Sequence, residues 1–280
     1  MPEIDRYGQV LSRDLRAAWP VVAATVNRLK GVVVGGTALA TVLQHRQSFD
    51  IDYQTTTSFS GRHLARKLAR VSASHELSCS IRQSEDGILD ASVNGVDVQI
   101  FRVLFQGKNP GYVKQIAAPV IIDGLAVASL PDLLAMELDV IMYRPKLRDY
   151  IDIAAIDQSR RFTIEDGLNF HAQQYGTAEI GHDTTQILRL LKSPSRLSAD
   201  RVFDHSATET LAYLKHRAEQ VSQALDQQRT PEVIGKNKRP PTLPIASLQT
   251  ADHCNVWMPI AQTRCQLPKG HQGHHRSQAN

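Results

Sequence analysis

The segment at residues 32–52, VVVGGTALATVLQHRQSFDID, constrains the fold more than any other part of the chain. Its apolar run Val32–Val34 predicts a buried strand, because β-branched residues favour extended backbone. The turn Gly35–Thr37 predicts the start of a short helix over residues 38–43, since glycine accommodates a tight reversal. A second strand is expected over residues 50–56. Strand, turn, helix and strand in this order predict a mixed α/β unit.

The same turn is a candidate phosphate-binding site. Gly35 and Gly36 carry no Cβ, so their backbone N–H groups can approach a ligand closely. The helix N-terminus behind them adds unpaired donors and partial positive charge, which favour an anion. Thr37 is expected to cap that helix or to hydrogen-bond the same anion. A tight turn without a ligand is the structural alternative.

Three carboxylates are candidate ligands for Mg²⁺ or Mn²⁺. Asp50 and Asp52 are two residues apart on an expected strand, so both side chains leave the same face. Asp97, in the alternating segment VDVQIF, is the candidate third acid from a neighbouring strand, although Asp86 and Asp90 lie close to it in sequence. Carboxylates together with substrate phosphates are a common Mg²⁺ environment. For an isolated Asp-x-Asp pair, the alternative is an Asx-turn or a solvated strand edge.

The remaining sequence predicts further strands and then helices alone. Residues 10–29 show an amphipathic helical pattern in which Pro20 predicts a kink or a break. Asp86–Gly87 and Asp123–Gly124 predict hairpin turns, and Ser129 predicts a helix N-cap. The other expected elements are a basic helix at 61–71, strands at 75–83, 88–93, 95–104, 120–122 and 125–128, a loop at 106–111, and helices at 129–143, 146–157, 164–175, 183–191 and 207–225.

The basic helix has two interpretations. Its cations form either a solvated helix face or a strip that binds substrate phosphates or an RNA backbone. The net charge of +4 over 280 residues permits a nucleic-acid partner without demanding one.

The order of the expected elements predicts the fold class α+β, and the composition indicates a globular protein, for which the cytoplasm is the expected compartment. Hydrophobic residues make up 42% and charged residues 21% of the chain. No run of about eighteen apolar residues and no signal peptide is found, so no membrane partner is expected, and three cysteines do not suggest a disulfide framework. The expected domains are an α/β core at 1–130, a helical domain at 131–228, a proline-rich linker at 229–250 and a Cys/His tail at 251–280.

The tail predicts a structural Zn²⁺ site. Cys254, Cys265, His271 and His275 supply two thiolates and two imidazoles, a common tetrahedral zinc set, and His274 is an alternative to His275. Because so short a segment cannot bury a core, metal binding would supply its folding free energy. A His-rich tail without metal is the other interpretation.

Four motifs carry a family resemblance. GGTAL at 35–39 and HRQSFDID at 45–52, followed by LPDLLAM at 130–136 and RPKLRDYID at 144–152, resemble the AbiEii/AbiGii-type toxins of the DNA polymerase β-like nucleotidyltransferase superfamily. The resemblance covers roughly residues 10–195. It implies a nucleotidyltransferase fold, a mixed sheet flanked by helices, whose helical half completes the active-site cleft. The nucleotide-binding residues expected are Gly35, Gly36, Thr37, Arg46, Ser48, Lys146, Arg148 and Asp149.

For some of these residues, a structural role is the alternative to nucleotide binding. Arg46 closes the first helix, where a cation also favours the C-terminal dipole, and Ser48 is expected to orient the carboxylates or to begin the next strand. Arg148 and Asp152 are spaced for an ion pair on a helix surface. The chain also departs from the family, because Glu137 stands where many relatives carry a lysine. A carboxylate there would repel phosphate.

The resemblance implies a Mg²⁺-dependent enzyme that transfers a nucleotide from an NTP to an acceptor, RNA such as the 3′ end of tRNA. Such a chain acts as the toxin of a toxin–antitoxin or abortive-infection system and has a cognate antitoxin. In two-metal phosphoryl-type transfer, Asp50, Asp52 and Asp97 hold the ions, and Asp97 helps to deprotonate the attacking hydroxyl. The alternative is a non-catalytic nucleotide- or nucleic-acid-binding adaptor, which Glu137 favours. A metal-dependent nuclease also uses clustered acids but does not explain the glycine turn.

Overall fold

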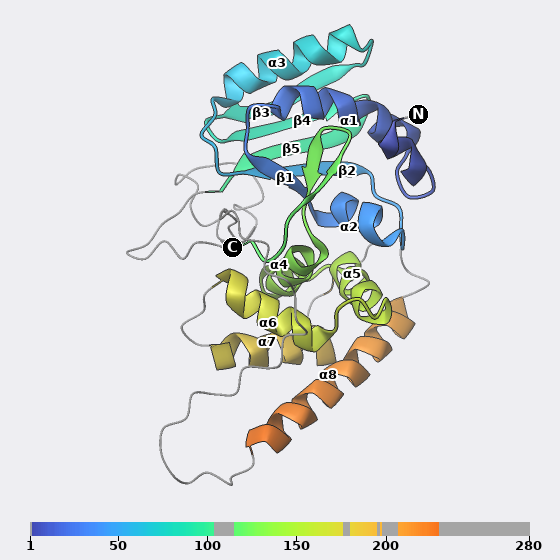
Figure 1. The fold of residues 1–280 in the computed structure, drawn as a ribbon, viewed down its shortest axis with the longest axis vertical. Helices are drawn as coiled ribbons and strands as arrows, with labels where there is room; N and C mark the ends of the chain where they lie inside the picture. Colours follow the sequence, from blue (N-terminus) through green and yellow to red (C-terminus); the bar gives the residue numbers. More distant parts are fainter. Residues whose placement is uncertain (1, 104–114, 176–179, 195–196, 198–206, 230–280) are drawn as a thin grey trace. The chain divides into compact units, whose positions relative to one another are not determined.

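The structure is a computed structural model that describes residues 2–103, 115–175, 180–194, 197 and 207–229. The expected loop at 106–111, nearly all of the linker at 229–250 and the Cys/His tail lie outside these residues. The described chain divides into two compact units, one ending at Leu133 and one starting at Leu134. Figure 1 shows the elements of both units along the chain.

The first unit is built on a mixed seven-stranded sheet in the order β3-β4-β5-β2-β1-β7-β6. β2 runs antiparallel to β1 but parallel to β5, and β1 runs parallel to β7. This confirms the mixed sheet predicted from the sequence. The strands are β1 (Gly31–Val34), β2 (Asp50–Thr55), β3 (Cys79–Glu85), β4 (Ile88–Val93), β5 (Val96–Arg102), β6 (Val120–Ile122) and β7 (Leu125–Val127).

Helices α1 (Arg13–Val26) and α3 (Gly61–Ser74) pack over the β3–β4–β5 side of the sheet, as Figure 1 shows. Strand residues on the apolar face, such as Val98 and Ile100, are fully buried, whereas the alternate residues are more exposed. This alternation separates an apolar face from a polar one. The remaining helices of the unit are the 3₁₀ helix η1 (Glu3–Tyr7) and α2 (Gly35–Leu43).

Pro20 was predicted to kink or break the helix, and the break into two helices does not occur. α1 is one helix from Arg13 to Val26 with Pro20 inside it. Proline removes a single backbone hydrogen bond, and the flanking stripe compensates because Leu15, Trp19 and Val22 are completely buried. The indole Nε1 of Trp19 also donates to the Ile122 carbonyl at 2.9 Å.

Both predicted hairpin turns are confirmed. Gly87 joins β3 to β4 with φ +80°, and Asp123 and Gly124 join β6 to β7 with φ +40° and +84°. Positive φ explains why glycine and aspartate occupy these turns. A third turn, Asn94–Gly95, joins β4 to β5 in the same way.

Asp132 fixes the chain at the start of α4 (Leu130–Tyr143). Its carboxylate accepts hydrogen bonds from the backbone N–H groups of Ile116 and Ala117, at 2.9 and 3.3 Å, and from the Ser129 hydroxyl. Ser129 Oγ in turn accepts from the Asp132 N–H at 3.3 Å, which confirms the predicted N-cap. Burial raises the pKa of the Asp132 carboxyl to about 6, and these donors only partly oppose the effect.

The raised pKa of the Asp132 carboxyl predicts that the stability of the fold decreases as pH rises. Because the pKa in the folded state exceeds the unfolded value of 3.8, the stabilisation is present below that value and is lost as pH rises through about 6. We expect Asp132→Asn to remove this dependence, so its free energy of unfolding relative to wild type should improve by up to about 3 kcal/mol between pH 4 and 7.5. Urea unfolding at several pH values measures it. Asp86→Asn, at an exposed turn, is the control, and a pH-independent difference would contradict the prediction.

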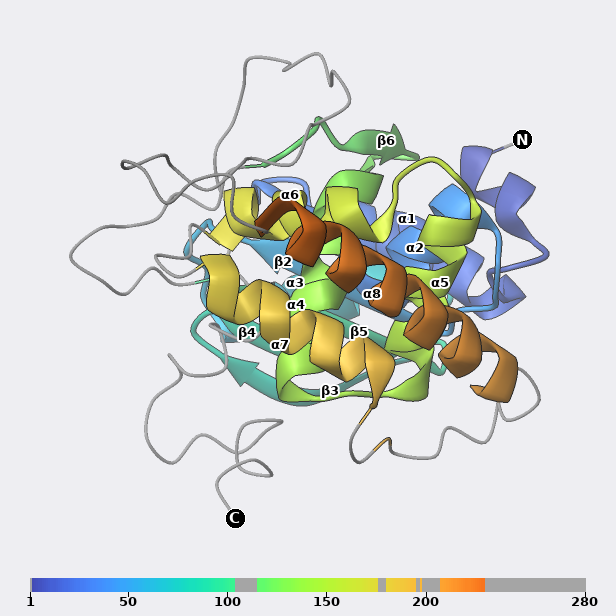
Figure 2. The ribbon, with the colours of Figure 1, turned by 90° about the horizontal axis from the view of Figure 1, so that it is seen from below.

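The second unit contains the rest of α4, followed by α5 (Leu147–Gln158), α6 (Ile164–Tyr175), α7 (Ile180–Lys192) and α8 (Ala207–Arg229). The predicted helical half is confirmed. Figure 2 shows α8 running beside α7 and α5, with which it makes its main contacts. Among the described helices, none is long and apolar enough to cross a membrane.

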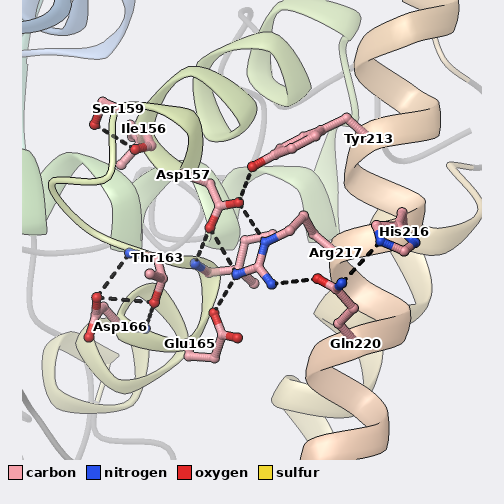
Figure 3. A network of polar contacts seen from close by, with 11 residues as sticks. Ile156, Asp157, Ser159, Thr163, Glu165, Asp166, Tyr213, His216, Arg217 and Gln220 are labelled. Atoms are coloured by element: carbon pink, nitrogen blue, oxygen red, sulfur yellow. Dashed lines mark hydrogen bonds and ion pairs between the residues drawn. The ribbon is translucent and has the colours of Figure 1, made fainter.

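An ion-pair network ties α8 to α5 and α6 (Figure 3). The buried Asp157 carboxylate accepts from Arg217 Nε at 2.8 Å, from Arg217 Nη2 at 3.2 Å and from the Ile164 N–H at 2.9 Å. Arg217 Nη2 also contacts Glu165 at 2.8 Å. Tyr213 donates its hydroxyl to Asp157 at 2.5 Å, and burial followed by Asp157 raises the pKa of that phenol to about 12.

We expect Arg217→Met to lower the free energy of unfolding by about 3 kcal/mol, because it leaves the buried Asp157 carboxylate without its cation. Lys215→Met changes an exposed cation on the same helix and should cost less than about 0.5 kcal/mol. Urea unfolding followed by circular dichroism compares the two variants. Equal losses in both would show that the network contributes nothing specific.

Candidate active site

The predicted carboxylates lie on the polar face of the sheet of the first unit. β2 and β5 pair in parallel with Asp50 opposite Asp97 and Asp52 opposite Gln99. Residues opposite each other on neighbouring strands project to the same side. The prediction that these three acids share a face is therefore confirmed, and Asp90, opposite Gln99 on β4, extends the acidic surface.

Thr37 anchors the start of β2. Its buried hydroxyl donates to the backbone carbonyl of Asp50 and lies 2.8 Å from Ser48 Oγ, which is 3.3 Å from Asp50 Oδ1. α2 begins at Gly35 and has no side-chain cap, so the prediction that Thr37 caps it is wrong. The hydroxyl instead satisfies a carbonyl outside the helix. The contact with Asp50 supports the interpretation that Ser48 orients a carboxylate.

The two glycines allow close approach of other site residues to the first turn of α2. A Cβ on Gly35, where φ is +69°, would lie 3.2 Å from Asp52 Oδ2. A Cβ on Gly36 would lie 2.6 Å from Arg46 Nη2. The guanidinium of Arg46 therefore rests against the helix start, and its Nη1 donates to the Gln47 carbonyl at 3.1 Å. A cation at this helix start suits a phosphate ligand.

Arg82 is a site residue that the sequence analysis missed. The register between β3 and β4 shifts at Ile81/Gln83, and a β-bulge of this kind redirects a side chain. The guanidinium of Arg82 contacts Asp97 Oδ1 and Asp90 Oδ1, each at 2.6 Å. The sequence itself contained a signal for this contact, because Arg82 lies in an expected strand and the next two expected strands carry Asp90 and Asp97.

The carboxylates fit a divalent ion in part. In the described ranges of the chain, no three Asp, Glu, His or Cys side chains already form a metal cluster. Asp50 and Asp52 fit Mg²⁺ that is also held by nucleotide phosphates, whereas Asp97 must first leave Arg82. That step costs little, because Asp97 and Arg82 are 60% and 42% exposed and such ion pairs contribute about 1 kcal/mol or less.

The predicted nucleotide-binding residues of the second unit lie around the start of α5. Lys146 precedes the helix, and its N–H donates to the carboxylate of Asp149 at 3.1 Å. Asp149 is buried, which raises the pKa of its carboxyl, while Arg144 and Arg148 oppose the shift. The Asp149 carboxylate thus caps α5.

The nucleotide-binding roles of Lys146, Arg148 and Asp149 stay predictions. Glu137, the departure from the family, is buried on α4. The zinc ligands Cys254, Cys265, His271 and His275 lie outside the described residues, so the zinc site also stays a prediction.

The sheet, the helix start after β1 and the paired acids of β2 and β5 are compatible with an enzyme that handles nucleotide phosphates. A sequence model of the family described as "Nucleotidyl transferase AbiEii toxin, Type IV TA system" matches residues 26–232. The chain therefore belongs to the AbiEii nucleotidyltransferase toxin family. This membership assigns nucleotidyl transfer as the general chemistry, with a nucleotide as substrate and a cognate antitoxin as partner.

Two solved structures show a weak similarity to this chain. A candidate nucleotidyltransferase from H. pylori is 15% identical, with a TM-score of 0.46, over 77% of this chain and 97% of its own. The nucleotidyltransferase toxin MenT4 from Mycobacterium tuberculosis H37Rv is 13% identical, with a TM-score of 0.40, over 78% of this chain and 88% of its own. A search of curated proteins gave no match. The assignment rests on the family match.

The glycines of α2 give a prediction that separates binding from folding. We expect Gly36→Ala to displace the flexible end of Arg46 with little effect on stability, and to weaken Mg–NTP binding about tenfold through loss of one charged contact. Gly35→Ala should also destabilise the fold by about 1–2 kcal/mol, because alanine disfavours positive φ. Calorimetric titration and urea unfolding measure the two effects. Unchanged nucleotide affinity in Gly36→Ala would exclude this helix start as the phosphate site.

Proposed function

We propose that this chain is a Mg²⁺-dependent nucleotidyltransferase that transfers a nucleotide from an NTP to the 3′ end of an RNA, with tRNA as the preferred acceptor. The observation that supports it most is the parallel register of β2 and β5, which aligns Asp50 with Asp97 on the polar face that also bears Asp52. In this proposal the transfer arrests growth as a toxin activity, and a cognate antitoxin counteracts it.

The reaction is a single substitution at phosphorus. The 3′-hydroxyl oxygen of the acceptor attacks the α-phosphorus of the NTP, and a new P–O bond forms. The bond from that phosphorus to the bridging oxygen of the β-phosphate breaks, and pyrophosphate leaves with the electron pair. The hydroxyl proton passes to the Asp97 carboxylate, which is exposed and therefore accessible to an acceptor.

The chain's own residues prepare this step. Asp50 and Asp52 would hold Mg²⁺, which supplies charge neutralisation at the attacking and leaving oxygens. Thr37 fixes the backbone of Asp50, so its carboxylate extends from an anchored position. The helix start at Gly36 and the guanidinium of Arg46 bind the triphosphate as an anion. Arg82 pairs with Asp97, and this contact would have to open for Asp97 to act in the reaction.

The test incubates purified protein with Mg²⁺, total bacterial tRNA and each labelled NTP separately. We expect label on the RNA with one NTP, pyrophosphate release, and a loss of about 10³-fold in Asp52→Asn, because removing a metal ligand forfeits several kcal/mol of transition-state stabilisation. Asp86→Asn, an exposed acid in the β3–β4 turn, is the matched control and should keep full activity.

The other outcomes are equally specific. Label on a protein or a small molecule would overturn RNA as the acceptor while leaving nucleotidyl transfer intact. A cut RNA without pyrophosphate would instead indicate a nuclease. No label with any NTP, together with no heat of Mg–NTP binding, would exclude catalysis.

A second candidate function, a non-catalytic nucleotide-binding adaptor, is favoured by the Arg82–Asp97 contact. An arginine that neutralises Asp97 can replace a metal ion as its partner. The adaptor predicts nucleotide binding that is independent of Mg²⁺ and unaffected by Asp52→Asn. If the chain is an enzyme, nucleotide binding should require both Mg²⁺ and the Asp52 carboxylate.

A further inference from the structure

The second charged surface of the first unit lies on the apolar side of the sheet, away from the carboxylates. A groove between α3 and the edge strand β3 is lined by Arg62, Ala65, Arg66, Ala69, Ile81 and Ser84. α3 has no acidic residue in its 14 positions, yet it carries four cations, Arg62, Arg66, Lys67 and Arg70. We propose that this α3–β3 groove binds the phosphodiester backbone of the RNA acceptor; the inference rests on the proposed function.

The cations of α3 lack acidic partners. In the described part of the chain, Arg62, Arg66 and Arg70 form no ion pair, and each is exposed. Lys67 is held by the Thr25 carbonyl and the Asn27 side chain, at 2.8 and 2.7 Å. Such a concentration of like charge without counterions raises the local potential and favours a polyanion.

Neighbouring cations add to this potential. Burial, followed by the charges of Arg28 and Arg70, lowers the pKa of the Lys67 ammonium, so the cluster extends from α3 to the end of α1. A bound phosphate would relieve the repulsion among these groups.

The spacing of the arginines suits a nucleic-acid strand. Arg62, Arg66 and Arg70 are each four residues apart, so they lie along one side of the helix and span about 12 Å. A row of this length can contact successive phosphates of one nucleic-acid strand. Duplex RNA is recognised mainly through such backbone contacts.

The groove is also held in place. A Cβ on Gly61 would lie 2.0 Å from the Glu85 carbonyl and 2.5 Å from that of Ile88, so α3 starts in direct contact with the β3–β4 hairpin. The Gly87 N–H also donates to the Phe59 carbonyl at 3.0 Å. A row of arginines on a fixed helix binds with a smaller loss of conformational freedom.

The lining favours RNA over a protein partner. Protein interfaces concentrate their binding energy in aromatic and large apolar anchors. This groove offers small residues, serine and a single large apolar side chain, Ile81, which is 39% exposed. Arginine, by contrast, is the preferred phosphate ligand.

The route to the carboxylates is short. β3 is an edge strand, and β5, which carries Asp97, lies two strands further in, at about 10 Å. A duplex stem on α3 can therefore extend an unpaired 3′ end of a few nucleotides around β3 to the polar face.

The experiment measures binding of a 5′-fluorescein RNA hairpin with an unpaired 3′ end by polarisation, at several salt concentrations. We expect the double variant Arg62→Ala/Arg66→Ala to weaken binding about 10- to 100-fold and to reduce the salt slope by about 1.4–1.8, as two lost phosphate contacts require. Arg62→Lys/Arg66→Lys should keep the slope. The control Arg13→Ala/Arg189→Ala removes two exposed arginines elsewhere and should change affinity less than about threefold.

The same variants separate this inference from the proposed function. If wild type transfers a nucleotide to RNA and Arg62→Ala/Arg66→Ala does so with unchanged KM, the groove is not the RNA site although the function stands. Loss of antitoxin binding in that variant, with RNA binding intact, would make the groove a protein interface and overturn the inference. If wild type binds the hairpin through these arginines but modifies no RNA, the acceptor assignment fails while the groove holds.

Discussion

The parallel pairing of β2 with β5 is the interaction on which the candidate site depends. The side chains of Asp50 and Asp52 project from one face of β2, because Ile51 and Tyr53 occupy the other face, which is buried. A slip of one residue would bury both carboxylates and expose the core. The hydrophobic pattern therefore specifies the acidic surface, and the buried Thr37 hydroxyl fixes the backbone where that surface begins.

The sequence predicted local features best. Alternation along β5 identified the face that carries Asp97, and positive φ at Gly87 and Gly124 explains why the hairpin predictions were correct. Asn94–Gly95 carries the same local signal and forms the turn between β4 and β5. These features depend on residues close together in sequence, where backbone preferences and side-chain alternation act directly.

The features that the sequence did not predict depend on tertiary contacts. Arg82, which contacts Asp97, lies at the register shift between β3 and β4, and no local sequence pattern predicts that shift. Thr37 seemed suited to cap a helix, yet its hydroxyl satisfies a carbonyl 13 residues away. Pro20 remained inside α1 because burial of Trp19 and its neighbours outweighs one missing hydrogen bond.

The charges on the two faces of the β3–β4–β5 sheet are opposite in sign. On one face Arg82 pairs with Asp90 and Asp97, and on the other Arg62, Arg66 and Arg70 of α3 form no ion pair with the residues that the structure describes. The apolar layer between them prevents direct pairing across the sheet. In the proposed function, the metal–nucleotide complex would bind the acidic face and the polyanionic RNA acceptor would bind the basic one.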